Sequence, residues 1–179
     1  MRKILQDKIN MNDINKICIM TQGKENDQRK EELYQLTFDE NDRVSFNALW
    51  ALTHFDEANN LWLFQKHDDL INRVLAEKNE TKRRLMLNLL LRQPFEEESL
   101  RSDFIDFCIA KITACSQPYA IRCYCMKLAY EQMKYYPELL EELRMALDML
   151  EQEVLSPGLQ SAKRQIMKKI KRSLGKFEK

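Results

Sequence analysis

The sequence predicts an all-α fold built from stacked helix pairs. Only 3 glycines and 4 prolines occur among 179 residues, whereas hairpins, bulges and phosphate-binding loops depend on both residue types. Hydrophobic residues make up 44% of the chain and charged residues 32%, which supplies enough apolar surface for a core and differs from the composition of disordered chains. Long helices joined by short turns fit this composition, and the length is typical of one domain.

Helix-start signals recur at a nearly constant spacing, which predicts a repeat. They occur at Asp42, Thr81, Pro118 and Pro157, so successive starts are 39, 37 and 39 residues apart. Asp42 and Thr81 are expected to be N-caps, whereas the two prolines suit a first helical turn, Pro157 after the capping candidate Ser156. Each start opens the second helix of a pair, and the first three of these helices are apolar on more than one face.

The first helix of a pair has one apolar stripe at steps of three and four residues. The clearest stripe consists of Leu139, Leu143, Ala146, Leu147, Leu150 and Val154, and 67–75 and 104–115 carry similar ones. Each pair is too apolar to stand alone, so neighbouring pairs are expected to cover one another. The predicted organisation is a single domain over 1–179. An N-terminal helical cap at 1–23 ends at the helix-stop candidate Gly23. Helix pairs follow at 27–55, 58–93, 97–134 and 136–174, and the chain ends in a tail at 175–179.

Three segments resemble HEAT repeats, in which an acidic turn leads to a Val-Arg-like start and an Ala-Leu-rich second helix. They are DENDRVSFNALWAL (39–52), SQPYAIRCYCMKLA (116–129) and SPGLQSAKRQIMKKI (156–170). The Trp, Leu-Gly and Tyr series of tetratricopeptide repeats is absent from the sequence. The resemblance covers roughly 27–174 and implies an α-α superhelix, a HEAT-like solenoid of about four helix pairs, whose second helices line a concave surface that binds proteins or nucleic acid. A closed helical bundle is the alternative arrangement.

Charge and cysteine content restrict the function classes. The net charge of +1 provides no strong field to attract nucleic acid or an acidic membrane, so any such binding would have to be local. Charged residues interrupt 1–20 at short intervals, which excludes a signal or membrane-spanning segment there and predicts a cytoplasmic protein without membrane insertion. The five cysteines are expected to be reduced, and Cys123 and Cys125 to be buried rather than metal-binding, because residues two apart point to nearly opposite sides of a helix. No metal or other cofactor is predicted.

The C-terminal helix is the most conspicuous candidate binding surface. Its cations are Lys163, Arg164, Lys168, Lys169, Lys171, Arg172, Lys176 and Lys179, and Glu178 is the single acidic residue after Ser156. A basic amphipathic helix can bind phosphate backbones, anionic lipid or an acidic partner. The favoured interpretation is a solvated cap, with a narrow apolar stripe and with cations stabilised by the C-terminal end of the helix dipole.

Two further groups have a binding and a structural interpretation. Arg43, Lys82, Arg83, Arg84 and Arg122 lie within the first turns of second helices, where they would form a basic ridge if stacking aligned them. Solvation, or pairing with the acidic turns, is favoured because their positions within the repeats differ. Trp50, Trp62, Tyr119 and Tyr124 could anchor a partner, although packing between repeats is favoured because their helices are crowded with apolar residues.

No catalytic motif is visible. His67-Asp68-Asp69 superficially matches a paired His-Asp metal site, but His54 is the only other histidine, so histidines cannot complete a ligand set. The leading prediction is a non-enzymatic protein-protein interaction scaffold or adaptor, with another protein as partner. The alternative is a nucleic-acid-binding module similar to the HEAT-like glycosylases of alkylated DNA, which a concave face dense in Arg and Lys would favour. The third hypothesis is an enzyme whose active site lies in the groove of the concave surface. A deep polar pocket with perturbed ionisable groups would favour it.

Overall fold

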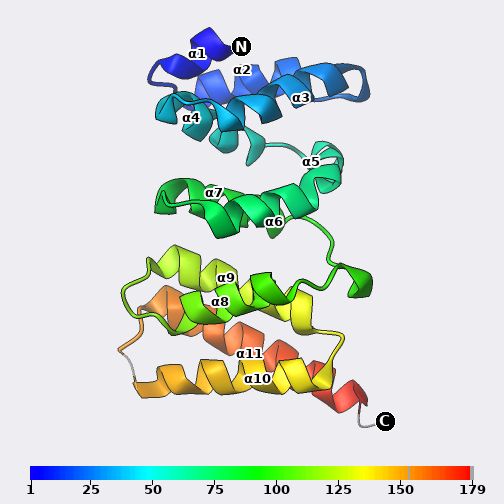
Figure 1. Cartoon of the computed structure of the whole chain (residues 1–179), viewed down its shortest axis with the longest axis vertical. Coiled ribbons are helices and arrows are strands. Elements are labelled where there is room, and N and C mark those ends of the chain that lie inside the picture. Colours follow the sequence, from blue (N-terminus) through cyan, green and yellow to red (C-terminus); the bar gives the residue numbers. More distant parts are fainter. Residues whose placement is uncertain (153, 178–179) are drawn as a thin grey trace. The chain divides into compact units, whose positions relative to one another are not determined.

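The computed structural model describes residues 1–152 and 154–177, and these residues form helices and turns without a β-strand (Figure 1). The chain divides into two compact units, Met1–Gln93 and the segment from Pro94 onward. The predicted all-α fold class of helix pairs is confirmed. The assignment of the whole chain to a single domain stays a prediction.

The first unit contains two helix pairs preceded by two further helices. Its helices are α1 (Arg2–Gln6), α2 (Met11–Thr21), α3 (Asp27–Gln35), α4 (Asp42–Leu52), α5 (Glu57–Leu63), α6 (His67–Ala76) and α7 (Glu80–Leu90), with 3-10 turns η1 (Lys24–Asn26), η2 (Leu36–Phe38) and η3 (Phe64–Lys66). Helices α3 and α4 form one pair and α6 and α7 the next (Figure 1). Helices α1 and α2 pack on α4, and their role as an N-terminal cap stays a prediction.

Asparagine side chains start the second helices of this unit. The Asn41 side chain accepts hydrogen bonds from the backbone N–H groups two and three positions later, at 3.0 and 3.3 Å, and Asn79 does the same at 2.9 and 3.2 Å. The prediction that Asp42 and Thr81 are the N-caps is therefore wrong by one and two residues. Both asparagines have an extended backbone, from which the side chain reaches the first turn.

Backbone conformation and side-chain capping determine two other helix boundaries in the first unit. Gly23 follows the end of α2 with a φ of 103°, a conformation that glycine adopts without strain, so the predicted helix stop is confirmed. The separate helix α5, within the predicted pair 58–93, was not anticipated. Asp56 caps it, and the buried Asn60 donates to the carbonyl oxygen of Arg92 at 2.6 Å, which fastens α5 to the end of α7.

The second unit contains two further helix pairs. Its helices are α8 (Ser102–Thr113), α9 (Tyr119–Met133), α10 (Pro137–Asp148) and α11 (Pro157–Phe177), with 3-10 turns η4 (Glu97–Ser99) and η5 (Met149–Gln152). Helix α8 pairs with α9, and α10 with α11 (Figure 1). Pro157 occupies the first position of α11, as predicted, and the Ser156 hydroxyl accepts from the Leu159 N–H at 3.4 Å. Helix α11 continues to Phe177, beyond the predicted end at 174, and Glu178 and Lys179 lie outside the described residues.

Most residues of the predicted stripes are buried. Leu70, Ile71 and Val74 of α6 have no exposed surface, and the stripes of α8, α10 and α11 are likewise buried along most of their length. Two stripe residues are exposed. Cys115 follows the end of α8 at Thr113, and Val154 lies beyond the turn that follows the end of α10 at Asp148. Within each unit, the main helix contacts join helices at most three places apart in chain order, as in a helical repeat.

Candidate functional site

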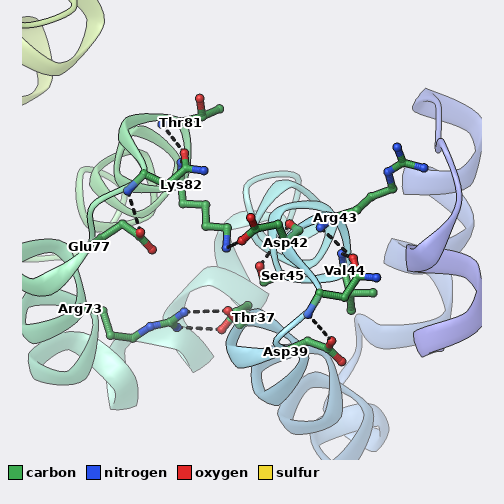
Figure 2. A network of polar contacts seen from close by, with 12 residues as sticks. Thr37, Asp39, Asp42, Arg43, Val44, Ser45, Arg73, Glu77, Thr81 and Lys82 are labelled. Carbon is green, nitrogen blue, oxygen red and sulfur yellow. Dashed lines mark hydrogen bonds and ion pairs between the residues drawn. The ribbon is translucent and has the colours of Figure 1, made fainter.

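Several cations of the first unit connect one repeat to the next. Arg73 of α6 donates from Nη1 to the Thr37 hydroxyl at 2.7 Å and from Nη2 to the Thr37 carbonyl oxygen at 2.9 Å, while its guanidinium lies 3.8 Å from the centre of the Phe38 ring. Lys82 of α7 reaches back to the Asp42 carboxylate at 2.6 Å. Figure 2 shows both connections, which join residues 36 and 40 positions apart, close to the repeat length.

A shallow depression of about 450 Å³ adjoins this network, lined by both cations and also by Asp39 and Glu77. The Arg2 guanidinium forms two bonds to the Asp39 carboxylate and holds the pKa of that carboxyl below its usual value. The Lys82 ammonium likewise lowers the pKa of Asp42. Because these cations are already paired with groups of the protein, the depression is a weak candidate for binding an anionic ligand.

Arg83 and Arg122 were candidates for a binding surface, but both are buried, with 7% and 1% of their surface exposed, so neither contributes to a basic surface ridge. Arg83 donates to the carbonyl oxygens of Val74 and Glu77 near the end of α6, and the Arg122 Nε donates to the Ile112 carbonyl oxygen at the end of α8 at 2.9 Å. Carbonyl groups in the last turn of a helix lack a partner within that helix. Each arginine therefore satisfies the end of the preceding helix in its own pair.

The remaining predicted residues of the first unit are accessible to different extents. Arg43 is exposed, and Figure 2 shows its side chain extending away from Asp42 and Lys82. Arg84 is half-buried on α7, and Trp50 is half-buried against the His54 ring, with 6.0 Å between ring centroids. No hydrogen bond, ion pair or ring contact joins these three residues in the described part of the chain, so they do not form a connected site.

The other predicted aromatic residues also divide between packing and exposure. Trp62 is half-buried with the ammonium groups of Lys30 and Lys66 at 6.0 and 5.8 Å from its ring, and Tyr124 is half-buried on α9. Tyr119 is 56% exposed at the start of α9, which contradicts the favoured packing role for this residue. Its exposure follows from its position in the first turn, outside the buried face of the helix.

Helix α11 carries the largest group of exposed cations. No aspartate or glutamate occurs within its 21 residues. Arg164, Lys168, Lys171, Arg172 and Lys176 are exposed, and none of the five forms an ion pair with another residue that the structure describes.

The other two described cations of α11 are engaged with the protein. Lys163 is half-buried and engaged in a contact. Lys169 lies 3.4 Å from the Glu131 carboxylate and 4.9 Å from the centre of the Tyr130 ring. The opposite side of α11, which contains Leu159, Ala162, Ile166 and Ile170, is buried.

An apolar groove runs between α10 and α11, with a volume of about 630 Å³. Its lining consists of Arg144 from α10 and Met167, Lys168, Ile170, Lys171, Leu174 and Gly175 from α11. Arg144 lies between Glu141 at 2.6 Å and Asp148 at 3.0 Å, and the bond to Glu141 raises the pKa of its guanidinium. The sequence prediction found the lysines but missed the groove. Met167 and Leu174 gave a weak signal, because both lie on one flank of the buried stripe of α11.

The nucleophilic and metal-binding residue types are dispersed or buried. Burial raises the pKa of the Cys108 thiol, and the neighbouring Cys125 raises it further, so Cys108 is held in the unreactive thiol form. The Nδ1 atom of His67 lies 2.7 Å from the Gln93 side-chain oxygen. Among the described residues, no three histidine, cysteine, aspartate or glutamate side chains are grouped so that they could hold a metal ion. None of the described helices has the length and apolar character needed to span a bilayer.

Within each unit, helix pairs contact each other in chain order, and polar contacts at about the repeat spacing join them; these features are typical of a helical repeat protein. The family model for the HEAT repeat domain matches residues 1–170. The chain therefore belongs to the HEAT repeat family, as the sequence resemblance implied, and the match includes the N-terminal cap. No curated protein and no solved structure matches the chain.

Proposed function

We propose that this chain is a non-enzymatic protein-binding module whose binding surface consists of the exposed side of α11 and the adjoining groove between α10 and α11. HEAT repeat proteins often mediate protein interactions, which supports a binding role in general. The observation that supports this particular surface is the coincidence of five exposed cations without ion pairs in the described chain and an apolar groove of about 630 Å³. Polar and apolar groups combined in this way are typical of sites that bind proteins.

A nucleic-acid-binding role is the rival function, because exposed cations also attract phosphate groups. Two observations favour a protein partner. Arg83 and Arg122 are buried, which removes two members of the predicted basic ridge. The α11 cations adjoin the half-buried side chains of Met167 and Leu174, which a phosphate backbone would leave uncovered. The five cysteines are free, which supports a reducing compartment, and we place the interaction in the cytoplasm.

Affinity capture from the native lysate tests this function. The tagged chain is compared with the double variant Lys168→Glu/Lys171→Glu and with a control, Arg43→Glu, whose charge change lies on the exposed start of α4. Each capture is repeated after nuclease treatment and at raised salt. We expect a specific protein that survives nuclease, is retained by the control and is lost from the double variant.

The opposite outcomes are equally clear. Nucleic acid that is captured by the wild-type chain and lost at raised salt would support the rival function. A protein retained equally by all three chains would place the binding surface elsewhere. Capture of no specific protein would contradict the binding function itself.

A further inference from the structure

We infer that the groove between α10 and α11 binds an acidic amphipathic helix from a partner protein, with the apolar side chains of that helix in the groove and its carboxylates on Lys168 and Lys171. This inference rests on the proposed protein-binding function and specifies the chemistry of the partner. Three features of the groove support it: its apolar lining, the distribution of charge on its two sides, and the position of its lysines.

The lining favours aliphatic or aromatic side chains over polar ones. Met167 and Leu174 are half-buried at the groove, and Ile170 is 1% exposed. Methionine adapts its unbranched side chain to the shape of an apolar partner. A volume of about 630 Å³ lies in the range of sites that enclose a ligand, and a helix laid in a groove inserts residues at positions i, i+3, i+4 and i+7.

The two sides of the groove differ in available charge. On the α10 side, Arg144 is neutralised by Glu141 and Asp148. On the α11 side, Lys168 and Lys171 are exposed and have no ion pair among the described residues. Carboxylates of a bound helix would therefore turn toward α11 and away from α10, which fixes the orientation of that helix about its own axis.

The spacing of the lysines strengthens this preference. Lys168 and Lys171 are three residues apart, and Arg164 lies four residues before Lys168, so these cations are neighbours on the helix surface. Like charges at these spacings destabilise a helix when they are unpaired. Carboxylates placed between them would relieve this repulsion, whereas a cationic or neutral partner would not.

The same geometry disfavours a membrane as the occupant. A basic amphipathic helix binds lipid by burying its apolar side in the acyl region. The apolar side of α11, including Leu159, Ile166 and Ile170, is already buried in the protein. A vesicle could therefore not bury this side of α11 in its acyl region while the helix remained packed.

Fluorescence anisotropy with synthetic peptides tests the inference on the full chain. The probes are a panel of 16-residue labelled helices with leucine, phenylalanine or methionine at i, i+3, i+4 and i+7 and glutamate on the opposite side. Matched peptides carry glutamine in place of every glutamate, or alanine in place of every apolar anchor. A 20-nucleotide single-stranded RNA and vesicles containing phosphatidylserine serve as probes for the other two classes of partner.

The variants separate the groove from the general charge of the chain. Lys168→Glu/Lys171→Glu reverses the two cations that line the groove, and Met167→Gln makes the lining polar. Arg43→Glu is the control, because it makes the same kind of charge change at an exposed residue of α4, outside the proposed binding surface. Thermal unfolding followed by circular dichroism verifies that each variant remains folded.

We expect at least one acidic peptide to bind the wild-type chain, and either the glutamine peptide or the lysine double variant to weaken that binding by about tenfold or more. Met167→Gln and the alanine peptide should also weaken it, whereas Arg43→Glu should change it by less than about threefold. An equal effect of Arg43→Glu and of the lysine variant would overturn the inference, because charge alone would then explain binding. So would RNA or vesicle binding that depends on Lys168 and Lys171 while no peptide of the panel binds at about 100 μM.

The two proposals can fail separately. If a lysate protein depends on α11 but no acidic helical peptide binds the groove, the protein-binding function stands and the acidic-helix inference fails. If no specific protein is captured, the function fails whether or not a synthetic peptide binds.

Discussion

The cations that join repeats in the first unit are paired with acceptors of the protein, whereas the exposed cations of α11 have no ion-pair partner among the described residues. Arg73, Lys82 and Arg92 each bind an acceptor about one repeat earlier in the chain: Thr37, Asp42, and the carbonyl oxygens of Thr53 and Phe55. Arg164, Lys168, Lys171, Arg172 and Lys176 have no ion-pair partner among the described residues. The same residue types thus stabilise the stack in one place and remain available for a partner in the other.

This difference shows that the number of cations in a helix does not reveal its role. A cation that has an acceptor one repeat before it, or a buried carbonyl at the end of the preceding helix, contributes to folding. A cation on a helix without carboxylates, facing solvent, contributes little to stability. The variants below test this distinction, beginning with the largest expected effect.

The buried guanidinium of Arg122 should be the most important of these cations for stability. Arg122→Ala leaves the Ile112 carbonyl without its donor and creates a cavity between α8 and α9, so we expect the free energy of unfolding to fall by about 3 kcal/mol. Urea denaturation followed by circular dichroism measures the change. Arg172→Ala is the matched control and should stay within about 0.5 kcal/mol of the wild type. Equal stability of the two variants would contradict the structural role of Arg122.

Arg73 should have the next largest effect. Arg73→Ala removes both bonds to Thr37 and the contact with the Phe38 ring, and should lower the free energy of unfolding by about 2 kcal/mol. Arg73→Lys should recover only part of the loss, because an ammonium cannot reproduce the two-donor geometry of guanidinium. Arg43→Ala, at an exposed residue of α4, is the control in the same urea experiment. Full recovery by lysine would show that charge, and not the paired bonds, carries the stabilisation.

Tyr34 provides a smaller effect with a distinct pH dependence. Burial, and then its hydrogen bond to the Asp69 carboxylate, raise the pKa of the Tyr34 hydroxyl. The folded state therefore retains this proton more tightly than the unfolded state. The resulting stability is complete below about pH 10, the ordinary pKa of tyrosine, and is lost as the pH rises above it.

Tyr34→Phe should lower the free energy of unfolding by about 1 kcal/mol at neutral pH through loss of this hydrogen bond. Its stability should also fall less steeply than that of the wild type above about pH 10. Tyr119→Phe, at an exposed position, controls for the loss of a hydroxyl group. Parallel pH profiles of wild type and Tyr34→Phe would contradict the raised pKa.

Local rules were sufficient to predict most of the fold. The end of α2 near Gly23, the start of α11 at Pro157 and the buried stripe of α6 follow from backbone geometry and helical periodicity. The stripe of α10 was predicted too long, through Val154, because periodicity continues across a turn that the backbone makes after Asp148. Apolar spacing alone does not locate the end of a helix.

The surfaces were less predictable because they depend on contacts between helices. Arg83 and Arg122 were interpreted as solvated or paired residues, or as parts of a surface ridge. Their spacing of 39 residues nevertheless equals the repeat and places both at the fourth position of a second helix. Because the two arginines share this position, the sequence alone could have indicated that they have the same structural role. The groove had no comparable signal, because its existence requires the packing of α11 against α10.

The smallest expected effect on stability is that of the two groove lysines. Lys168→Ala/Lys171→Ala removes no ion pair within the described chain, relieves repulsion between neighbouring cations, and introduces a strong helix former. The free energy of unfolding should therefore stay within about 0.5 kcal/mol of the wild type, while binding of the acidic peptides weakens. Urea denaturation and anisotropy on the same protein samples measure the two quantities together. A loss of stability near that of Arg73→Ala would instead assign these lysines to the fold, and the contrast between repeat-joining and partner-binding cations would not hold.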